Sequence, residues 1–278
     1  MNIIGIGAAG CKIASCFKIY SQYNVFCIDS EEAHSDASLL VKEQNSHEEY
    51  EKNYKRLNGL SNCKGLTTII VCGSGKISGI SLRVIEQLKK NKINIIYVKP
   101  DVSQLANKPL MRHRTTFGIL QEYARSGLLN KLYVVSNSNV ELILENISLE
   151  NYWQDINNLI CSAYHMLNVF ENTEPLLTTL VAETDTARIG TFGVANFDTG
   201  NEKLFYDLQR PRSKKYFYGI SENSMSNNRQ ILHLIRERMR TRSNENTHAS
   251  FSIYSTDYDQ NYVYSKHYAS LIQEQILE

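Results

Sequence analysis

The fold is decided by the stretch Asn2-Ile3-Ile4-Gly5-Ile6-Gly7-Ala8-Ala9-Gly10-Cys11-Lys12, at the beginning of the sequence. Residues 2–6 are a short apolar run that predicts a strand, and residues 12–20 carry apolar side chains at helical spacing. Between them, Gly5, Gly7 and Gly10 match the pattern GxGxxG. A glycine loop that leads into a helix presents unpaired N–H groups and, without Cβ atoms, lets a phosphate approach the backbone. The stretch therefore predicts a nucleotide-binding α/β domain whose first glycine loop faces a phosphate group.

Strands and helices alternate through the rest of the first half. Apolar runs predict strands at residues 25–28, 67–72, 95–98 and 132–135, and periodic segments predict helices at residues 80–90 and 110–126. Residues 34–64 are polar without sharp periodicity, which predicts a variable helix and loop. This alternation predicts a Rossmann-like, open parallel sheet with helices on both faces.

The second half has a different pattern. Residues 149–170 predict one long helix, with Trp153 and Ile156 among the residues of its apolar stripe. Strands are then predicted at residues 189–194, 216–220, 250–255 and 261–268, around a single helix at 226–240 that Ser226 caps. The sequence thus predicts three parts: a nucleotide-binding domain at 1–148, a central helix at 149–171, and a smaller α+β domain with a mixed sheet at 172–278.

Composition excludes several classes of function. A net charge of +1 over 278 residues gives no footprint for nucleic acid, and we interpret the cluster Arg236, Arg238, Arg240 and Arg242 as a solvated helix face. No apolar run approaches the ~20 residues that a membrane span needs. The six cysteines are scattered without CxxC pairs, so we expect reduced thiols, a cytoplasmic location and no metal site.

A second glycine loop, Gly73-Ser74-Gly75-Lys76-Ile77-Ser78-Gly79, follows the strand predicted at 67–72. It is not a Walker A motif, because Ile77 stands where a Ser or Thr is needed. The first loop alone, with Asp29 at the distance of a ribose-binding acid, is a complete dinucleotide fingerprint, so an NAD-dependent oxidoreductase stays an alternative. Two loops at neighbouring strand ends would instead hold a chain of phosphates from both sides.

With both loops in place, the sequence resembles the tubulin/FtsZ superfamily over most of its length. The first loop and Asp29 resemble that family's first phosphate loop and Thr-Asp-Ala strand end, and residues 73–79 stand where the family has its GGGTGSG-type signature. Further similar features are Lys99-Pro100, the helix with Arg112, the loop with Asn137, the central helix with Asn158 at its guanine-reading position, and the strand 189–195. An amide at the position of Asn158 can pair with the Watson–Crick edge of guanine.

The resemblance implies GTP or GDP as the ligand, with or without Mg²⁺, and a head-to-tail homopolymer in which the chain's partner is a second copy of itself. The residues that it assigns to the nucleotide are Gly5, Gly7, Ala8, Ala9, Gly10, Cys11, Lys12, Asp29, Gly73, Ser74, Gly75, Lys76, Ile77, Ser78, Gly79, Arg112, Asn137 and Asn158.

Two departures from the family's pattern weaken the expectation of catalysis. Ile77 replaces a glycine, and a β-branched residue does not readily take positive φ or admit a phosphate closely. In the family, acids on a loop after the central helix orient the attacking water of the next subunit; here Glu174 replaces the first acid and Leu177 the second. An apolar side chain cannot polarise water, so Glu174 is the one catalytic candidate and GTP hydrolysis is expected to be weak or absent. A structural relative that has lost the nucleotide is the second hypothesis, and the NAD-dependent oxidoreductase is the third.

Overall fold

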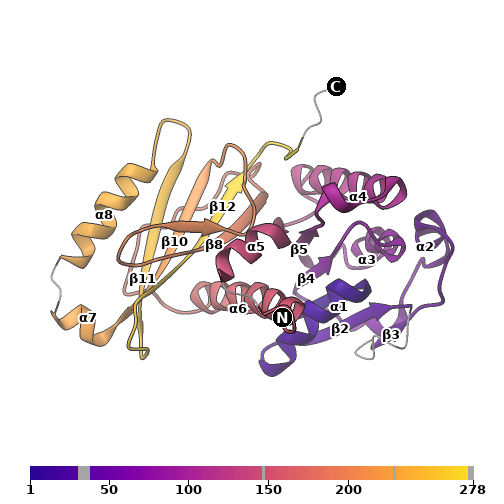
Figure 1. The fold of residues 1–278 in the computed structure, drawn as a ribbon, viewed down its shortest axis with the longest axis horizontal. Helices are drawn as coiled ribbons and strands as arrows, with labels where there is room; N and C mark the ends of the chain where they lie inside the picture. The colour runs from indigo at the N-terminus through magenta and orange to yellow at the C-terminus, as the bar shows by residue number, and fades with distance from the viewer. Residues whose placement is uncertain (31–37, 146–147, 228–229, 275–278) are drawn as a thin grey trace. The chain divides into compact units, whose positions relative to one another are not determined.

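The computed structural model describes residues 1–30, 38–145, 148–227 and 230–274. The chain divides into two compact units, residues 1–161 and 162–278, so the division falls inside the long helix α6 (Tyr152–Glu171; Figure 1). None of the helices in the ranges above is long and apolar enough to cross a membrane.

The first unit contains a parallel sheet with strand order β3-β2-β1-β4-β5-β6. These strands are β1 (Asn2–Ile6), β2 (Asn24–Asp29), β3 (Leu39–Leu40), β4 (Leu66–Val71), β5 (Lys92–Lys99) and β6 (Lys131–Ser136). Ile6, at the carboxyl end of β1, is in register with Ile28 of β2 and Val71 of β4, so these strands end at one edge of the sheet. Ile69, Ile70 and their neighbours are fully buried, as parallel strands covered on both faces require. The predicted Rossmann-like fold is confirmed.

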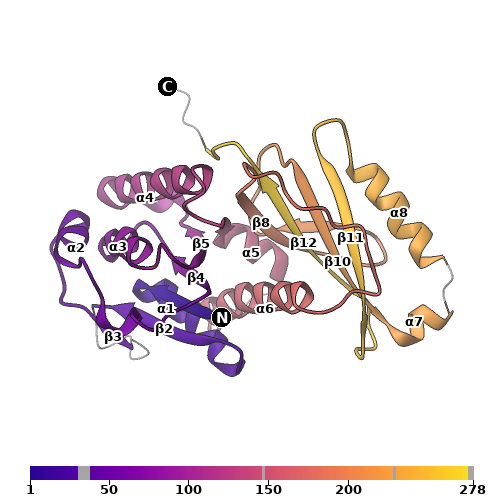
Figure 2. The ribbon, with the colours of Figure 1, turned by 180° about the vertical axis from the view of Figure 1, so that it is seen from behind.

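In the part of the first unit that the structure describes, five α-helices precede α6: α1 (Gly7–Cys16), α2 (His47–Asn53), α3 (Ile80–Gln87), α4 (Asn107–Arg125) and α5 (Asn137–Leu144). Short 3₁₀ turns lie at Phe17–Ile19, Asn58–Leu60, Lys76–Gly79 and Val102–Gln104. Helices α2, α3 and α4 lie next to one another in both views (Figures 1 and 2). Two predictions were wrong here: α1 begins at Gly7 rather than at residue 12, and the segment after β6 is a helix rather than a loop.

The second unit contains a mixed sheet with strand order β8-β12-β10-β11-β7, in which β9 pairs with β8. The β10–β11 pair is parallel and the other pairs are antiparallel. The strands are β7 (Leu177–Thr178), β8 (Ile189–Ala195), β9 (Glu202–Leu204), β10 (Ser213–Ser221), β11 (His248–Thr256) and β12 (Tyr262–Ala269). The predicted α+β class with a mixed sheet is therefore confirmed, and the short strands β7 and β9 are additions to it.

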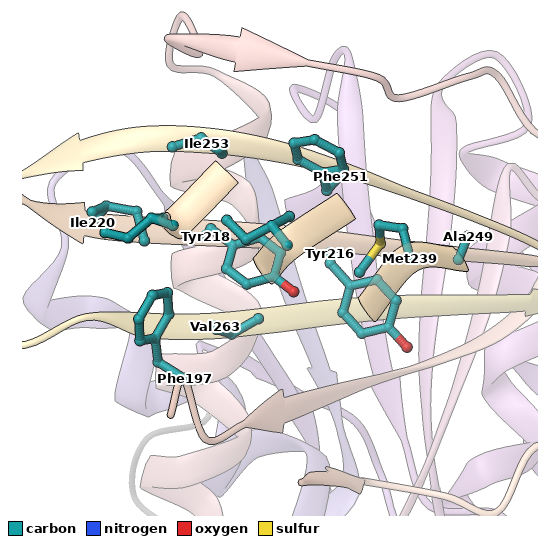
Figure 3. Packing of buried hydrophobic residues seen from close by; sticks show 11 residues of the cluster. Phe197, Tyr216, Tyr218, Ile220, Met239, Ala249, Phe251, Ile253 and Val263 are labelled. Carbon is teal, nitrogen blue, oxygen red and sulfur yellow. The ribbon is translucent and has the colours of Figure 1, made fainter. Parts of the chain in front are cut away.

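Two helices, α7 (Glu222–Asn227) and α8 (Ile231–Arg242), replace the single helix predicted at 226–240. Ser226 does not cap it: its hydroxyl donates to the carbonyl of Glu222 within α7, at 3.0 Å. The apolar residues Ile231, Ile235 and Met239 of α8 recur every four positions and face the sheet. They pack with residues of β10, β11 and β12 and with Phe197 in one buried cluster (Figure 3).

The arginines of α8 do more than cover a solvated face. Arg238 donates to the carbonyls of Phe197 and Asp198, and Arg242 donates to that of Gly200 at 2.6 Å. These bonds hold the turn between β8 and β9, so the interpretation of this cluster as solvated was wrong for two of its four members.

Candidate nucleotide site

The first glycine loop forms the start of α1. Gly7 has a φ of +71°, which a residue with a Cβ rarely adopts, and no side chain caps the free N–H groups of the first turn. Ala8 is half-buried and Ala9 is exposed, so this end of the helix is open to a ligand. The other two glycines are explained by packing. A Cβ on Gly5 would collide with the carbonyl oxygen of Gly10, and one on Gly10 would lie 2.5 Å from that of Ile70.

A cavity of about 220 Å³ lies at this opening, within the first unit. It is lined by residues from α1, β5, α5 and α6: Ala8, Ala9, Lys12, Ile13, Val98, Asn137, Trp153 and Asn157. Trp153 is 59% exposed, so its assignment to the buried apolar stripe was wrong. Its ring meets that of Tyr152 edge to face, at 5.0 Å between centroids. Lys12 is exposed and makes no ion pair with the described residues, which leaves its charge available to a ligand.

The two adjacent asparagines of α6 lie differently with respect to the cavity. Asn157 is 8% exposed and lines the cavity together with Asn137. Asn158 is exposed, accepts a hydrogen bond from Gln154 at 2.9 Å, and lines a neighbouring hollow that shares Lys12, Trp153 and Asn157 with the cavity. Asn137 and Asn157 thus line the cavity at the first glycine loop, and Asn158 does not.

The second glycine loop is packed against the protein itself. A Cβ on Gly73 would collide with Tyr97 Oη, and one on Gly79 would collide with the carbonyl oxygen of His47. The buried hydroxyl of Ser78 donates to the carbonyls of Gly73 and Gly75, at 3.1 and 2.8 Å. These contacts explain three of the small residues of this loop without a ligand.

Ile77 and Lys76 occupy the outer side of this loop. The Ile77 Cγ2 methyl would lie 2.8 Å from a Cβ on Gly7 and 4.0 Å from one on Gly75, so it stands between the two glycine loops. Lys76 forms an ion pair with Glu43 at 3.0 Å, with both side chains largely exposed. Ser74 contacts the Cys72 thiol at 3.5 Å.

Helices α2 and α4 support the second loop from behind. Tyr97 Oη and His113 Nδ1 are hydrogen-bonded at 2.7 Å, and both rings stack on Phe117. His47 Nε2 is 3.2 Å from Thr116 Oγ1, and burial lowers the pKa of this histidine. Arg112 of α4 has a buried Nε atom without a hydrogen-bond partner among the described residues, and it lies outside the cavity lining.

Asp29 and Cys11 are buried beside β1. Asp29 Oδ1 accepts a hydrogen bond from the backbone of Ser30 at 2.7 Å, while Oδ2 is buried with no partner in the described part of the chain. The Cys11 thiol points to the carbonyls of Gly5 and Ile28. A hydrogen bond with Cys27 and burial both raise the pKa of Cys11, so this side chain is a packing residue and only its backbone could face a phosphate.

Glu174 belongs to the second unit. It is exposed and makes no hydrogen bond or ion pair with any described residue. Leu177 lies in β7 opposite Ile253 of β11 and is 37% exposed. The segment after α6 is thus held to a sheet edge by β7.

Comparisons with known proteins bear on the fold. No family model matches the sequence, and no curated protein matches it either. Among solved structures, a GTPγS-form protofilament of TubZ from Bacillus thuringiensis serovar israelensis is similar, with a TM-score of 0.70 and 13% identity over 98% of this chain and 86% of that chain. An empty FtsZ dimer from M. jannaschii matches with a TM-score of 0.68 and 11% identity over 96% and 87% of the two chains. A GTPγS-bound protofilament of CetZ2 from Haloferax volcanii matches with a TM-score of 0.67 and 12% identity, over 96% of this chain and 92% of that chain. The chain therefore has the tubulin/FtsZ fold.

Proposed function

We propose that this protein binds a guanine nucleotide at the start of α1 and self-associates head to tail, with weak or absent hydrolysis. One observation carries the proposal. Asn137, Asn157, Trp153 and Lys12 come from three different helices and line one cavity beside the open amino terminus of α1. That is the edge of a parallel sheet at which ligands of α/β proteins bind.

The cavity has the chemistry of a purine site. The amide groups of Asn137 and Asn157 each offer donors and an acceptor, and the base presents both. The exposed ring of Trp153 offers a stacking surface. Lys12 favours guanine over adenine, because guanine presents the acceptors O6 and N7 where adenine has a donor amino group beside N7. In this assignment Asn157 takes the role predicted for Asn158.

The size of the cavity suits the base and part of the sugar. Small-molecule pockets generally have about 300–1,000 Å³, so a cavity of about 220 Å³ leaves the phosphates outside it. The free N–H groups of Gly7, Ala8 and Ala9 would bind the first of these phosphates. Asp29 does not line the cavity, but its carboxylate oxygen Oδ2 has no partner among the described residues and would suit a hydroxyl group or a phosphate-bound Mg²⁺. The described residues contain no group of three His, Cys, Asp or Glu side chains that could hold a metal alone, so Mg²⁺ would need the phosphates as ligands.

Support for self-association comes from the structures that share the fold, several of which are described as protofilaments or filaments. Weak or absent hydrolysis is supported by the chemistry of the segment after α6, where Leu177 offers no polar group and Glu174 is the one acid in the sequence Asn172-Thr173-Glu174-Pro175-Leu176-Leu177.

The alternative is a structural relative that has lost the nucleotide. The position of Ile77 between the two glycine loops favours it, because a methyl group there offers no hydrogen bond to a phosphate.

The single tryptophan of the chain, Trp153, gives a direct test, because it lines the cavity. Titration with GDP is expected to change its fluorescence in a saturable way, and ADP at the same concentrations is expected to change it much less. If neither nucleotide changes the emission, and calorimetry also detects no binding, the protein is the structural relative that has lost the nucleotide. Saturable binding of NAD, without binding of GDP, would favour the oxidoreductase hypothesis instead.

Assembly is tested separately by sedimentation at rising protein concentration, with and without GDP, followed by electron microscopy of the pellet. Filaments that depend on nucleotide are expected. A protein that stays monomeric while nucleotide is bound would refute the self-association part alone.

A further inference from the structure

We infer that Ile77 limits the site to nucleotides with no more than two phosphates, so that a nucleoside diphosphate binds better than the triphosphate. The inference rests on the proposed function, because it concerns the phosphate end of the same site.

The first step is the position of the Ile77 side chain. A Cβ on Gly7 would lie 2.8 Å from Ile77 Cγ2, which places this methyl group directly on the backbone of the first loop. The same methyl group is 4.0 Å from a Cβ built on Gly75 of the second loop. It therefore occupies the gap between the loops, through which a phosphate chain that reached both of them would pass.

The second step is the unsuitable surface that the second loop presents. The N–H of Ser78 donates to the carbonyl of Gly75 at 3.2 Å, and the hydroxyl of Ser78 is also turned inward. Tyr97 and His47 fill the space that a Cβ would take at Gly73 and Gly79, so a phosphate cannot approach these residues from that side. A phosphate at this loop would lose hydrogen bonds to water and would meet a methyl group, which offers no hydrogen bond in exchange. Desolvation of a charge without such compensation is costly.

Charge acts in the same direction. Lys76 is the cation of this loop, and its ion pair with Glu43 at 3.0 Å brings a carboxylate to the same place. An exposed pair of this kind contributes at most about 1 kcal/mol, so Lys76 could change partner. The Glu43 carboxylate would nevertheless remain nearby and repel a further negative charge. The steric effect of Ile77 is therefore the main cause of the selectivity, and Glu43 adds to it.

The first loop has none of these obstacles. The amino end of α1 has no side-chain cap and no acidic residue in its first turn, and Ala9 is exposed. A helix start of this kind binds phosphate by its N–H groups and its dipole. The open first loop, and a second loop of which Gly75 is exposed but Gly73 and Gly79 are packed, together favour a short phosphate chain. The diphosphate would then stay bound as a permanent ligand. Self-association would not be controlled by cleavage of a third phosphate.

Three proteins test the inference: the natural chain, Ile77→Ala and Ile77→Val. The alanine variant removes Cγ2, whereas the valine variant keeps a branched side chain at Cβ and loses only the δ methyl group. Affinities for GDP and for a non-hydrolysable GTP analogue are measured by calorimetry, and thermal melting shows whether each variant is folded.

The natural chain is expected to bind GDP at least about tenfold more tightly than the analogue, a difference that calorimetry resolves easily. Ile77→Val should keep this ratio, and Ile77→Ala should bring it close to one. Equal affinities in the natural chain would overturn the inference while leaving the proposed function intact, and this result does not depend on the folding of any variant. If neither nucleotide binds, the proposed function itself fails.

Discussion

Ile77 and Gly7 are in contact across the two glycine loops, although 69 residues lie between them in the sequence. A Cβ on Gly7 would lie 2.8 Å from Ile77 Cγ2, and Gly7 has a φ of +71°. Glycine is thus required at position 7 for two separate reasons, a backbone conformation and a close approach. Each reason has its own measurable cost.

Gly7→Ala is expected to lower the free energy of unfolding by more than Gly65→Ala. Gly65 has a φ of +79°, and a Cβ added there would meet nothing within 4 Å, so its substitution measures the cost of the backbone conformation alone, about 1–2 kcal/mol. Gly7→Ala adds the collision with Ile77. In an Ile77→Ala background this addition should disappear, so that both glycine substitutions cost the same. Urea unfolding of the four-variant cycle measures the coupling, and a Gly7→Ala cost that is the same in both backgrounds would show that the two side chains do not meet.

Lys12→Ala is expected to weaken GDP binding by about tenfold and to reduce the preference for GDP over ADP, because an ammonium group beside O6 and N7 contributes about 1–3 kcal/mol of base discrimination. Lys18→Ala removes the same charge from an exposed position just after α1 and serves as the control. Parallel titrations followed by Trp153 fluorescence measure both. An equal loss in the two variants would assign the effect to general electrostatic attraction rather than to the base.

The second unit is expected to lose stability in acid through Glu202. Burial raises the pKa of this carboxyl group. Three interactions outweigh burial and lower the pKa to about 2: the hydrogen bond with His267 at 3.0 Å, the charge of His267, and the hydrogen bond from Ser265. Tyr216 Oη also donates to it at 3.0 Å. Because the folded pKa lies below the ordinary value of 4.5, the carboxylate stabilises the fold fully above about pH 4.5, and this stabilisation is lost as the pH falls through 2.

The size of this effect is about 3 kcal/mol, from about 1.4 kcal/mol for each unit of pKa shift. Chemical unfolding followed from about pH 5 down to about pH 2 should show the decline in the natural chain and a smaller decline in Glu202→Gln. Glu245→Gln, at an exposed position, is the control. An identical pH dependence of Glu202→Gln and the natural chain would remove Glu202 as the cause.

The parallel sheet could be predicted because its determinants are local. Strand β4 is a β-branched, largely apolar segment that ends in a glycine loop, and both features are visible without knowledge of any partner strand. The same is true of β1 and the start of α1, whose glycines are needed for packing as well as for approach by a ligand. In the second unit the long strands β10, β11 and β12 are evident from their apolar and aromatic content, while β7 and β9 are too short to produce a pattern.

The candidate site could be predicted only in part, because it depends on side-chain direction. Successive residues of a helix point about 100° apart, so Asn157 lines the cavity and Asn158 does not, although both line the neighbouring hollow and are equally suited to bind a base. Tryptophan at position 153 fits an apolar stripe by its spacing, and only the structure shows that it faces the cavity. The sequence predicts that Ile77 hinders phosphate binding, but its contact with Gly7 depends on how the two loops approach each other.

Asn157→Ala and Asn158→Ala form the most direct test of the claim that a guanine base lies in the cavity. The two substitutions are chemically identical and adjacent on α6, but Asn157 lines the cavity and Asn158 does not. The affinity for GDP, measured by calorimetry, is the quantity to compare. Loss of a buried amide that pairs with the base is expected to weaken binding by about tenfold or more in Asn157→Ala, and Asn158→Ala should bind GDP as the natural chain does. A loss of affinity in Asn158→Ala with none in Asn157→Ala would contradict the account.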